Sequence, residues 1–105
     1  MTANSPMQES HMPRLILFVT GNAPRTQRAR VNLAKMLEQI GRNDLTPYEI
    51  DLLQQPHEGL TYSVFATPSL LKTDDEQGGS LLYGDLSDDD RLYRFLADLT
   101  PATTT

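Results

Sequence analysis

A continuous run of apolar residues near the start of the chain is the feature that most constrains its fold. The run, Leu15–Val19, contains five apolar residues and no polar one. A strand of this kind is covered on both faces, which is typical of a central strand in a layered α/β domain. It is also far shorter than the roughly 20 apolar residues with which a helix crosses a membrane. We therefore expect an α/β fold with this strand at its centre, and no membrane contact.

The segment after this strand predicts a helix that begins at Pro24. Proline suits the first position of a helix, because its missing N–H group would have no partner there. Apolar residues then recur at helical spacing, namely Ala29, Leu33, Met36, Leu37 and Ile40. Gly41 follows, and glycine readily adopts the left-handed conformation that ends many helices.

The remaining segments predict three more strands and two more helices. The expected strands are 47–52, 69–72 and 80–83, and 56–64 is expected to form a short, weak helix. The acidic segment Thr73–Gly79 joins the last two strands as a hairpin loop. The last helix is expected to start at Ser87, whose hydroxyl group can cap the first turn. Asp88–Asp90 then complement the positive end of the helix dipole.

The resulting order is β-α-β-(α)-β-β-α, which describes a mixed four-stranded sheet and a thioredoxin-like arrangement. A β-α-β unit pairs its strands in parallel, and the hairpin adds an antiparallel strand. In this arrangement a proline commonly stands in the cis form before the third strand. Pro68 occupies that place, so we expect a cis Thr67–Pro68 bond, whose cost of about 0.5–1 kcal/mol packing can offset. The alternative is an ordinary trans proline at the start of a strand.

The chain has no cysteine, although redox thioredoxins carry a Cys-x-x-Cys pair at the start of the first helix. The corresponding residues here are Gly21–Pro24. Thiol redox catalysis, disulfides and thiolate metal sites are therefore excluded. The chain also lacks phosphate-loop, dinucleotide, nucleophile-elbow and zinc-protease motifs, so we expect no enzyme, no cofactor and no metal. The aspartates at 85 and 88–90 lack calcium-loop spacing and are interpreted as helix-capping residues.

The net charge of −5, from nine basic and 14 acidic residues, argues against general binding of nucleic acid. The N-terminal segment lacks a basic-then-apolar signal, so we expect a cytoplasmic location. Residues 1–13 and 101–105 are polar and without periodicity. We expect them to be disordered tails on either side of one domain, residues 14–100.

Five segments carry a more specific pattern, with G-N-x-P, A-T-P and G-D-L-S-D in that order. They are Leu17–Pro24, Arg28–Ala29, Ile50–Leu53 with Pro56, Ala66–Leu70 with Lys72, and Gly84–Asp88. In this combination the chain resembles the KaiB family of circadian-clock proteins and their bacterial relatives. The resemblance implies a non-enzymatic protein that binds the KaiC ATPase, competes with the related domain of a clock-output histidine kinase and remodels the clock complex. It also leaves open a sensor or adaptor domain without clock function, which binds a signalling histidine kinase, a stress-response protein or a second copy of itself.

The resemblance also implies which residues contact the partner. Arg28 matches the partner-contacting arginine of the family, and Arg25 adds to a basic stripe that Lys35 and Arg42 continue at seven-residue intervals. Thr46 and Tyr48 belong to a second contact region, where the family often has a basic residue in place of Tyr48. The alternative interpretation of the stripe is an ordinary solvated helix face.

Two further residues bear on the fold state, because some family members exchange a tetrameric fold for the thioredoxin-like one. Those members carry Gly-Leu-Asp-Leu where this chain has Phe95–Asp98. Phe95 and Ala97 favour a helix more than glycine does. We therefore expect this chain to stay in the thioredoxin-like form.

Overall fold

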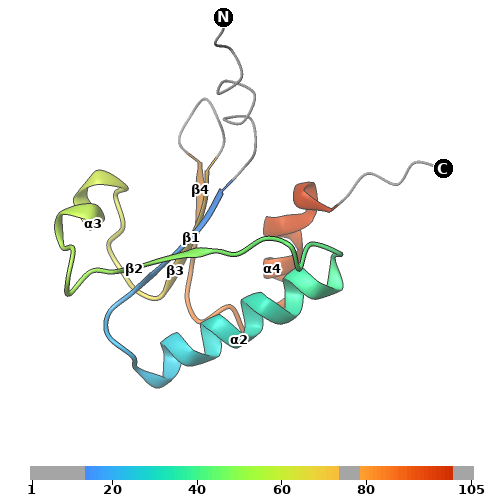
Figure 1. Ribbon diagram of the computed structural model, residues 1–105, viewed down its shortest axis with the longest axis horizontal. Helices are drawn as coiled ribbons and strands as arrows, with labels where there is room; N and C mark the ends of the chain where they lie inside the picture. Colours follow the sequence, from blue (N-terminus) through green and yellow to red (C-terminus); the bar gives the residue numbers. More distant parts are fainter. Residues whose placement is uncertain (1–13, 74–78, 101–105) are drawn as a thin grey trace, which may run out of the picture.

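A four-stranded mixed sheet forms the centre of the structure, a computed structural model that describes residues 14–73 and 79–100 (Figure 1). The strands are β1 (Arg14–Val19), β2 (Tyr48–Asp51), β3 (Ser69–Thr73) and β4 (Ser80–Tyr83), in the order β2-β1-β3-β4. β1 runs parallel to β2 and antiparallel to β3, which in turn pairs antiparallel with β4. β1 is therefore central, as its apolar sequence predicts. The predicted tails and residues 74–78 of the predicted acidic loop lie outside the described residues.

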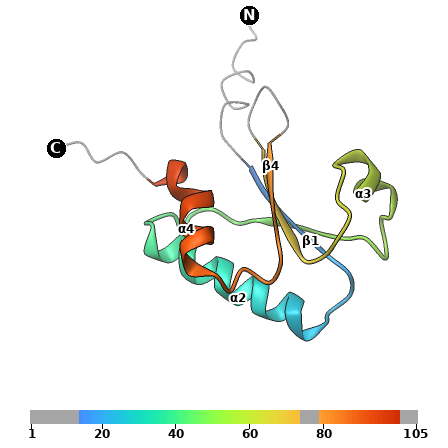
Figure 2. The same ribbon diagram turned by 180° about the vertical axis from the view of Figure 1, so that it is seen from behind.

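Two helices cover one face of the sheet. α2 (Pro24–Gln39) connects β1 to β2, and α4 (Asp89–Leu96) follows β4 and continues into the 3₁₀ helix η1 (Ala97–Leu99). Figure 2 shows α4 above α2, in front of the segment that leads from α2 to β2. The short helix α3 (His57–Thr61) lies toward the opposite end of the sheet (Figure 1). Among the described residues, no helix has both the length and the apolar character to cross a membrane.

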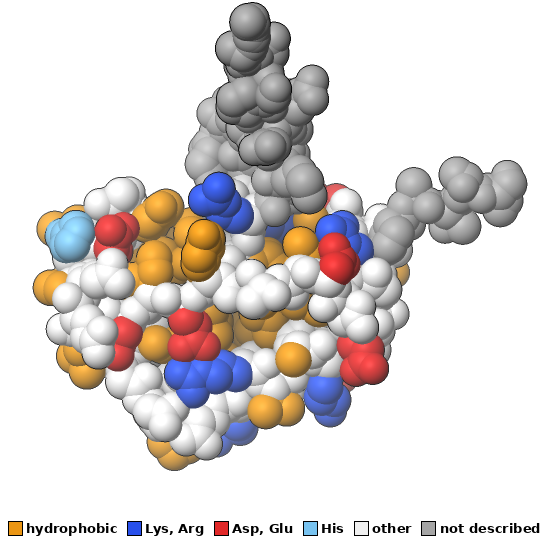
Figure 3. All heavy atoms as spheres, in the orientation of Figure 1, with side chains coloured by type: hydrophobic (Ala, Val, Ile, Leu, Met, Phe, Trp, Pro, Cys, Tyr) orange, Lys and Arg blue, Asp and Glu red, His pale blue; other side chains and the backbone are white. Residues whose placement is uncertain are grey.

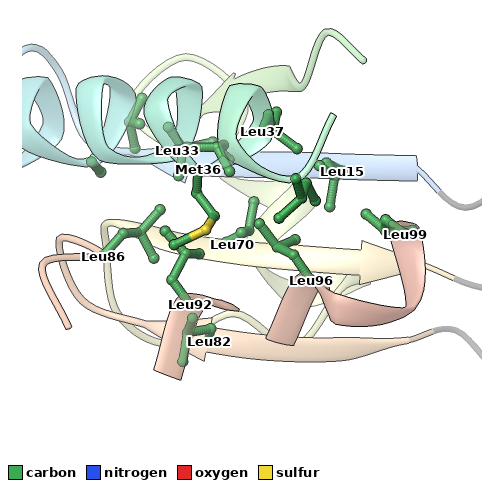
Figure 4. Close-up of a cluster of buried hydrophobic side chains, with 14 residues drawn as sticks. Leu15, Leu33, Met36, Leu37, Leu70, Leu82, Leu86, Leu92, Leu96 and Leu99 are labelled. Carbon is green, nitrogen blue, oxygen red and sulfur yellow. The ribbon is translucent and has the colours of Figure 1, made fainter. Parts of the chain in front are cut away.

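The core lies on both faces of β1. Alternate residues of a strand point to opposite faces. Leu15, Leu17 and Val19 join the larger cluster, which α2 and α4 complete (Figure 4). Ile16 and Phe18 join a smaller cluster with Val64 and Leu71. The whole run from Leu15 to Val19 is at most 5% exposed, which confirms that this strand is covered on both faces.

Several element ends differ from the sequence-based prediction. The second strand begins at Tyr48, because Pro47 has no N–H group to donate to a ladder. α3 is shorter than the predicted 56–64. Ser63 adopts a left-handed φ of 59°, which ends the helical path and lets Val64 turn into the smaller cluster. The last helix divides at Leu96 into α4 and η1.

The predicted cap at Ser87 is wrong. The residue that caps α4 is Asp88, whose Oδ1 accepts a hydrogen bond from the Arg91 N–H group at 3.2 Å. Ser87 instead donates its own N–H group to Asp85 Oδ1 at 3.2 Å. Leu86, two residues before the cap Asp88, has a left-handed φ of +64°, so the chain turns before the helix starts.

Candidate functional site

Arg25 and Arg28 lie in the first two turns of α2, beside the loop that joins β4 to α4. Arg28 Nε lies 3.0 Å from Asp85 Oδ2, and the Arg28 side chain is still 54% exposed. Asn32 Nδ2 donates to the Asp85 carbonyl oxygen at 3.0 Å, which ties the loop to the helix a second time. Arg25 lines a shallow hollow with the same loop and with Arg91. We call Arg25, Arg28 and Gly84–Asp88 the arginine surface.

The carboxyl group of Asp85, on this surface, has a strongly lowered pKa. Hydrogen bonds from Ser87, and then from Arg28, lower the pKa of Asp85 from 3.8 to about 2. Because these donors favour the ionised carboxylate, Asp85 carries its full charge at neutral pH. The charge holds the Arg28 side chain in place at the surface.

Replacing Arg28 by alanine is expected to raise the pKa of Asp85 only part of the way toward 3.8, because the larger effect of Ser87 remains. Since the native pKa lies below that of the unfolded chain, the pair stabilises the fold above pH 3.8 and loses this effect as the pH falls toward 2. A carboxyl-carbon NMR titration measures the pKa. Lys35→Ala, about two turns further along α2, is the control. An equal pKa of Asp85 in all three proteins would contradict this assignment.

Thr46 and Tyr48 lie at the other side of the molecule, on the edge strand β2 and the loop before it. Tyr48 is 60% exposed, and the Arg14 guanidinium lies 5.8 Å from the centre of its ring. Glu49 points to the α2 side, where Arg30 donates to its two carboxylate oxygens at 2.6 and 2.9 Å. We call Thr46, Tyr48 and Arg14 the β2 surface.

The structure therefore divides the four predicted contact residues between two surfaces. β2 and β4 are the opposite edges of the sheet. Arg28 and Arg30 are two residues apart and therefore about 200° apart around the helix. One reaches Asp85 beyond β4, and the other reaches Glu49 on β2. Figure 1 has β2 in front, whereas Figure 2 has α4 in front. A single small contact patch does not contain both surfaces.

Two cations, Lys72 and Arg42, hold the C-terminal segment, a role that sequence reasoning did not predict for them. Lys72 Nζ donates to the Phe95 carbonyl oxygen and to Asp98 Oδ1, each at 2.7 Å, and lies 5.1 Å from the Phe95 ring centre. Arg42 Nη1 donates to the Leu99 carbonyl oxygen at 3.0 Å. Such contacts satisfy carbonyl groups that a helix end leaves without partners.

These contacts also correct the interpretation of the basic stripe. Arg42 does not belong to a solvated face, because its side chain is only 21% exposed and reaches Leu99 and Asp44. Phe95 is half-buried against the main cluster, and Ala97 begins η1. Lys72 lies on β3 and its side chain faces α4. The register of the predicted hairpin could have indicated this position.

Thioredoxins carry their cysteines at one end of the sheet. At that end, this chain has hydrogen bonds that involve hydroxyl and carboxylate groups. The Thr67–Pro68 bond is cis. The hydroxyl groups of Thr20 and Thr67 share a hydrogen bond of 2.6 Å. Asp51 Oδ1 accepts from the N–H groups of Gly21 and Leu53 at 3.2 and 2.9 Å. Within the described residues, no three His, Cys, Asp or Glu side chains are grouped to hold a metal ion.

Comparisons with known proteins bear on both the fold and the family. The family model described as KaiB domain matches residues 16–97. The thioredoxin of Fasciola hepatica is similar in structure, with a TM-score of 0.69, 13% identity, and coverage of 88% of this chain and 85% of that one. Thioredoxin f2 of Chlamydomonas reinhardtii gives 0.70 and 13%, covering 91% of this chain and 86% of that one. These structural likenesses show a thioredoxin-like fold. No curated protein sequence matches the chain.

Proposed function

The chain belongs to the KaiB family, and on that premise we propose that it is a non-enzymatic protein that binds a KaiC-type ATPase and regulates the complex. The family match spans every strand from Ile16 onward, the whole arginine surface, and Thr46 and Tyr48 of the β2 surface. The proposal places residues 14–100 as the binding domain and the complex in the cytoplasm. It includes neither nucleic acid nor a cofactor.

The observation that supports this proposal most is that Asp85 already holds the Arg28 side chain in place. Asp85 holds the guanidinium by its Nε atom, so the side chain has lost part of its freedom before any partner arrives. The Nη1 and Nη2 groups make no hydrogen bond to the described residues, so on this half-exposed side chain their donors remain for a partner. A fixed guanidinium pairs well with a carboxylate in two-pronged geometry. The arginine surface therefore fits an acidic patch on the ATPase.

Co-elution with the ATPase tests the proposal. The full chain and a KaiC-type ATPase of the same organism are mixed and separated by size exclusion, once with ATP and once without it. We expect the chain to move into the ATPase fraction in at least one nucleotide state. Separate elution in both states, at concentrations well above micromolar, would refute the proposal.

Arg28→Ala is expected to weaken ATPase binding by about tenfold or more, as the loss of a central interface arginine does. The same change should cost the fold at most about 1 kcal/mol, because the ion pair is half-exposed. Lys35→Ala removes an exposed cation from the same helix and should leave the affinity almost unchanged. Calorimetric titration gives the affinities, and chemical denaturation gives the stabilities. Equal affinity of Arg28→Ala and the unmodified chain would count against the arginine surface.

We also propose that the chain keeps the thioredoxin-like form. Phe95 packs on the main cluster, and Lys72 and Arg42 bind carbonyl groups of the C-terminal segment. Ala97 adds helix propensity that glycine lacks. NMR spectra at several temperatures should therefore show one set of peaks. A second set whose shifts place residues 88–99 in strands would show that another fold is populated.

Tyr48 favours a second candidate function, a sensor or adaptor domain that binds a signalling histidine kinase, a stress-response protein or another copy of the chain. The family often has a basic residue at this place, and the phenol group of Tyr48 is not a basic group. The Arg14 guanidinium, 5.8 Å from the Tyr48 ring, supplies a positive charge nearby, which keeps the ATPase the first candidate. Co-elution with such a kinase but not with the ATPase would favour the second.

A further inference from the structure

A hollow of about 350 Å³ opens between α2 and β2, away from the arginine surface. Its floor consists of Leu17, Leu33 and Leu37, which are each 2% exposed, so the floor belongs to the main core. Figure 3 shows this hydrophobic surface recessed below β2, beside a charged pair. The hollow is within the size range of sites for small molecules, and such sites are mostly apolar with a few polar groups.

Hydrogen bonds hold both walls of the hollow in place. At one end, Arg30 donates to both oxygens of Glu49 and, through Nη1, to Asn22 Oδ1 at 2.7 Å. At the other end, the loop after α2 is fixed because Arg42 binds both Asp44 and the Leu99 carbonyl oxygen. The Leu45 N–H group donates back to the Arg42 carbonyl oxygen at 3.0 Å. A ligand would therefore meet a preformed site and would not have to order it.

The polar groups around the hollow indicate the charge of a fitting ligand. Nε, Nη1 and Nη2 of Arg30 are all used, and its charge is balanced by Glu49. An anionic ligand would have to displace Glu49, and a charged group over the apolar floor would lose its hydration. Asn43 and Thr46 also line the hollow, and their side chains make no hydrogen bond to the described residues. These two side chains suit one uncharged hydroxyl or carbonyl group.

The volume sets the size of the ligand. A cavity of about 150 Å³ holds one benzene molecule, so the larger hollow has room for two fused rings or an equivalent branched chain. We propose that the hollow between α2 and β2 binds a small, uncharged, mainly apolar molecule with one hydrogen-bonding group. The site shares no residue with the arginine surface, although Thr46 belongs to both the hollow and the β2 surface, and the probe experiment below needs no ATPase.

The test uses 2-naphthol, which has two fused rings and one hydroxyl group, as the probe. It is titrated into the ¹⁵N-labelled full chain while amide shifts are recorded. We expect saturable shifts at Arg30, Ala34, Leu45 and Thr46. Naphthalene-2-sulfonate, which has the same rings and an anionic group, should bind more weakly. No saturable shift, shifts centred elsewhere, or equal binding of the sulfonate would overturn the proposal.

Ala34→Leu supplies the decisive variant. Ala34 is exposed and lines the hollow, and leucine is a good helix former, so the change fills the site and leaves the helix intact. It should weaken 2-naphthol binding by about tenfold or more, because the added side chain takes the space in which the ligand is buried. Lys35→Leu introduces the same side chain at the next, exposed position and should leave binding unchanged. Undiminished binding to Ala34→Leu would overturn the assignment of the site.

Discussion

Leu92→Ala is expected to lower the free energy of unfolding by about 3 kcal/mol, the usual cost of emptying a leucine site in a core. Leu92 is 0% exposed and lies in the first turn of α4. Figure 4 shows its side chain between Met36 of α2 and Leu82 of β4. The leucine therefore joins three elements of the main cluster. Urea denaturation followed by circular dichroism measures the effect.

Tyr93→Ala is the matched control for this experiment. Tyr93 is the next residue of α4 and is 51% exposed, so it contributes little to the core. Its replacement should change the free energy of unfolding by less than about 1 kcal/mol. Equal losses in the two variants would contradict the position of α4 against α2 and the sheet.

Lys72→Met is expected to cost about 2 kcal/mol, because it leaves the carbonyl group of Phe95 without a donor in a half-buried place. Methionine keeps the length of the apolar stem, so the packing is largely retained and the lost ammonium group is what the variant reports. Lys72 is only 17% exposed and binds both Phe95 and Asp98. Amide hydrogen exchange in η1 should speed up more than exchange in α2, since η1 begins beside these contacts.

Lys35→Met provides the comparison, because Lys35 is exposed on α2. It should leave both the stability and the exchange of η1 unchanged within about 0.5 kcal/mol. If Lys72→Met behaved in the same way, the lysine would not hold the C-terminal segment, and the proposed preference for one fold would rest on Phe95, Ala97 and the contact of Arg42 with Leu99.

Much of the fold was predictable because its signals are local. The apolar run of β1, the proline at the start of α2 and the glycine after it each act through their own backbone neighbours. The structure confirms the thioredoxin-like arrangement and the mixed sheet. The cap of α4 was less accessible, because Ser87 and Asp88 are both good caps. The left-handed Leu86, which the sequence does not reveal, decides between them.

The arrangement of the candidate site was harder to predict, because it depends on contacts between distant segments. Arg42 was placed on the basic stripe by helical spacing. The helix ends at Gln39, however, and Gly41 turns the chain with a φ of 78°, so that spacing no longer applies to Arg42. The resemblance joined Arg28 and Tyr48 as contact residues. Only the strand order shows that they lie toward opposite edges of the sheet.

The absence of cysteine can be compared with the thioredoxin-like fold that the structure shows. The chain keeps the arrangement of thioredoxins, including a cis proline before β3. Thr20 and Thr67 bind each other at the end of the sheet where those proteins have their cysteines. A fold shared at 13% identity carries no shared activity with it. The proposed function rests instead on surface contacts, of which the arginine surface is the best defined.

The interface itself can be mapped by NMR of the ¹⁵N-labelled chain with its unlabelled KaiC-type ATPase, in the nucleotide state that gives co-elution. We predict that the amide signals of Arg25, Arg28 and Gly84–Asp88 shift or broaden first, while those of α3 keep their positions. Addition of the ATPase without any change in the spectrum, or with changes confined to α3, would contradict the proposal that this protein acts by binding such an ATPase through its arginine surface.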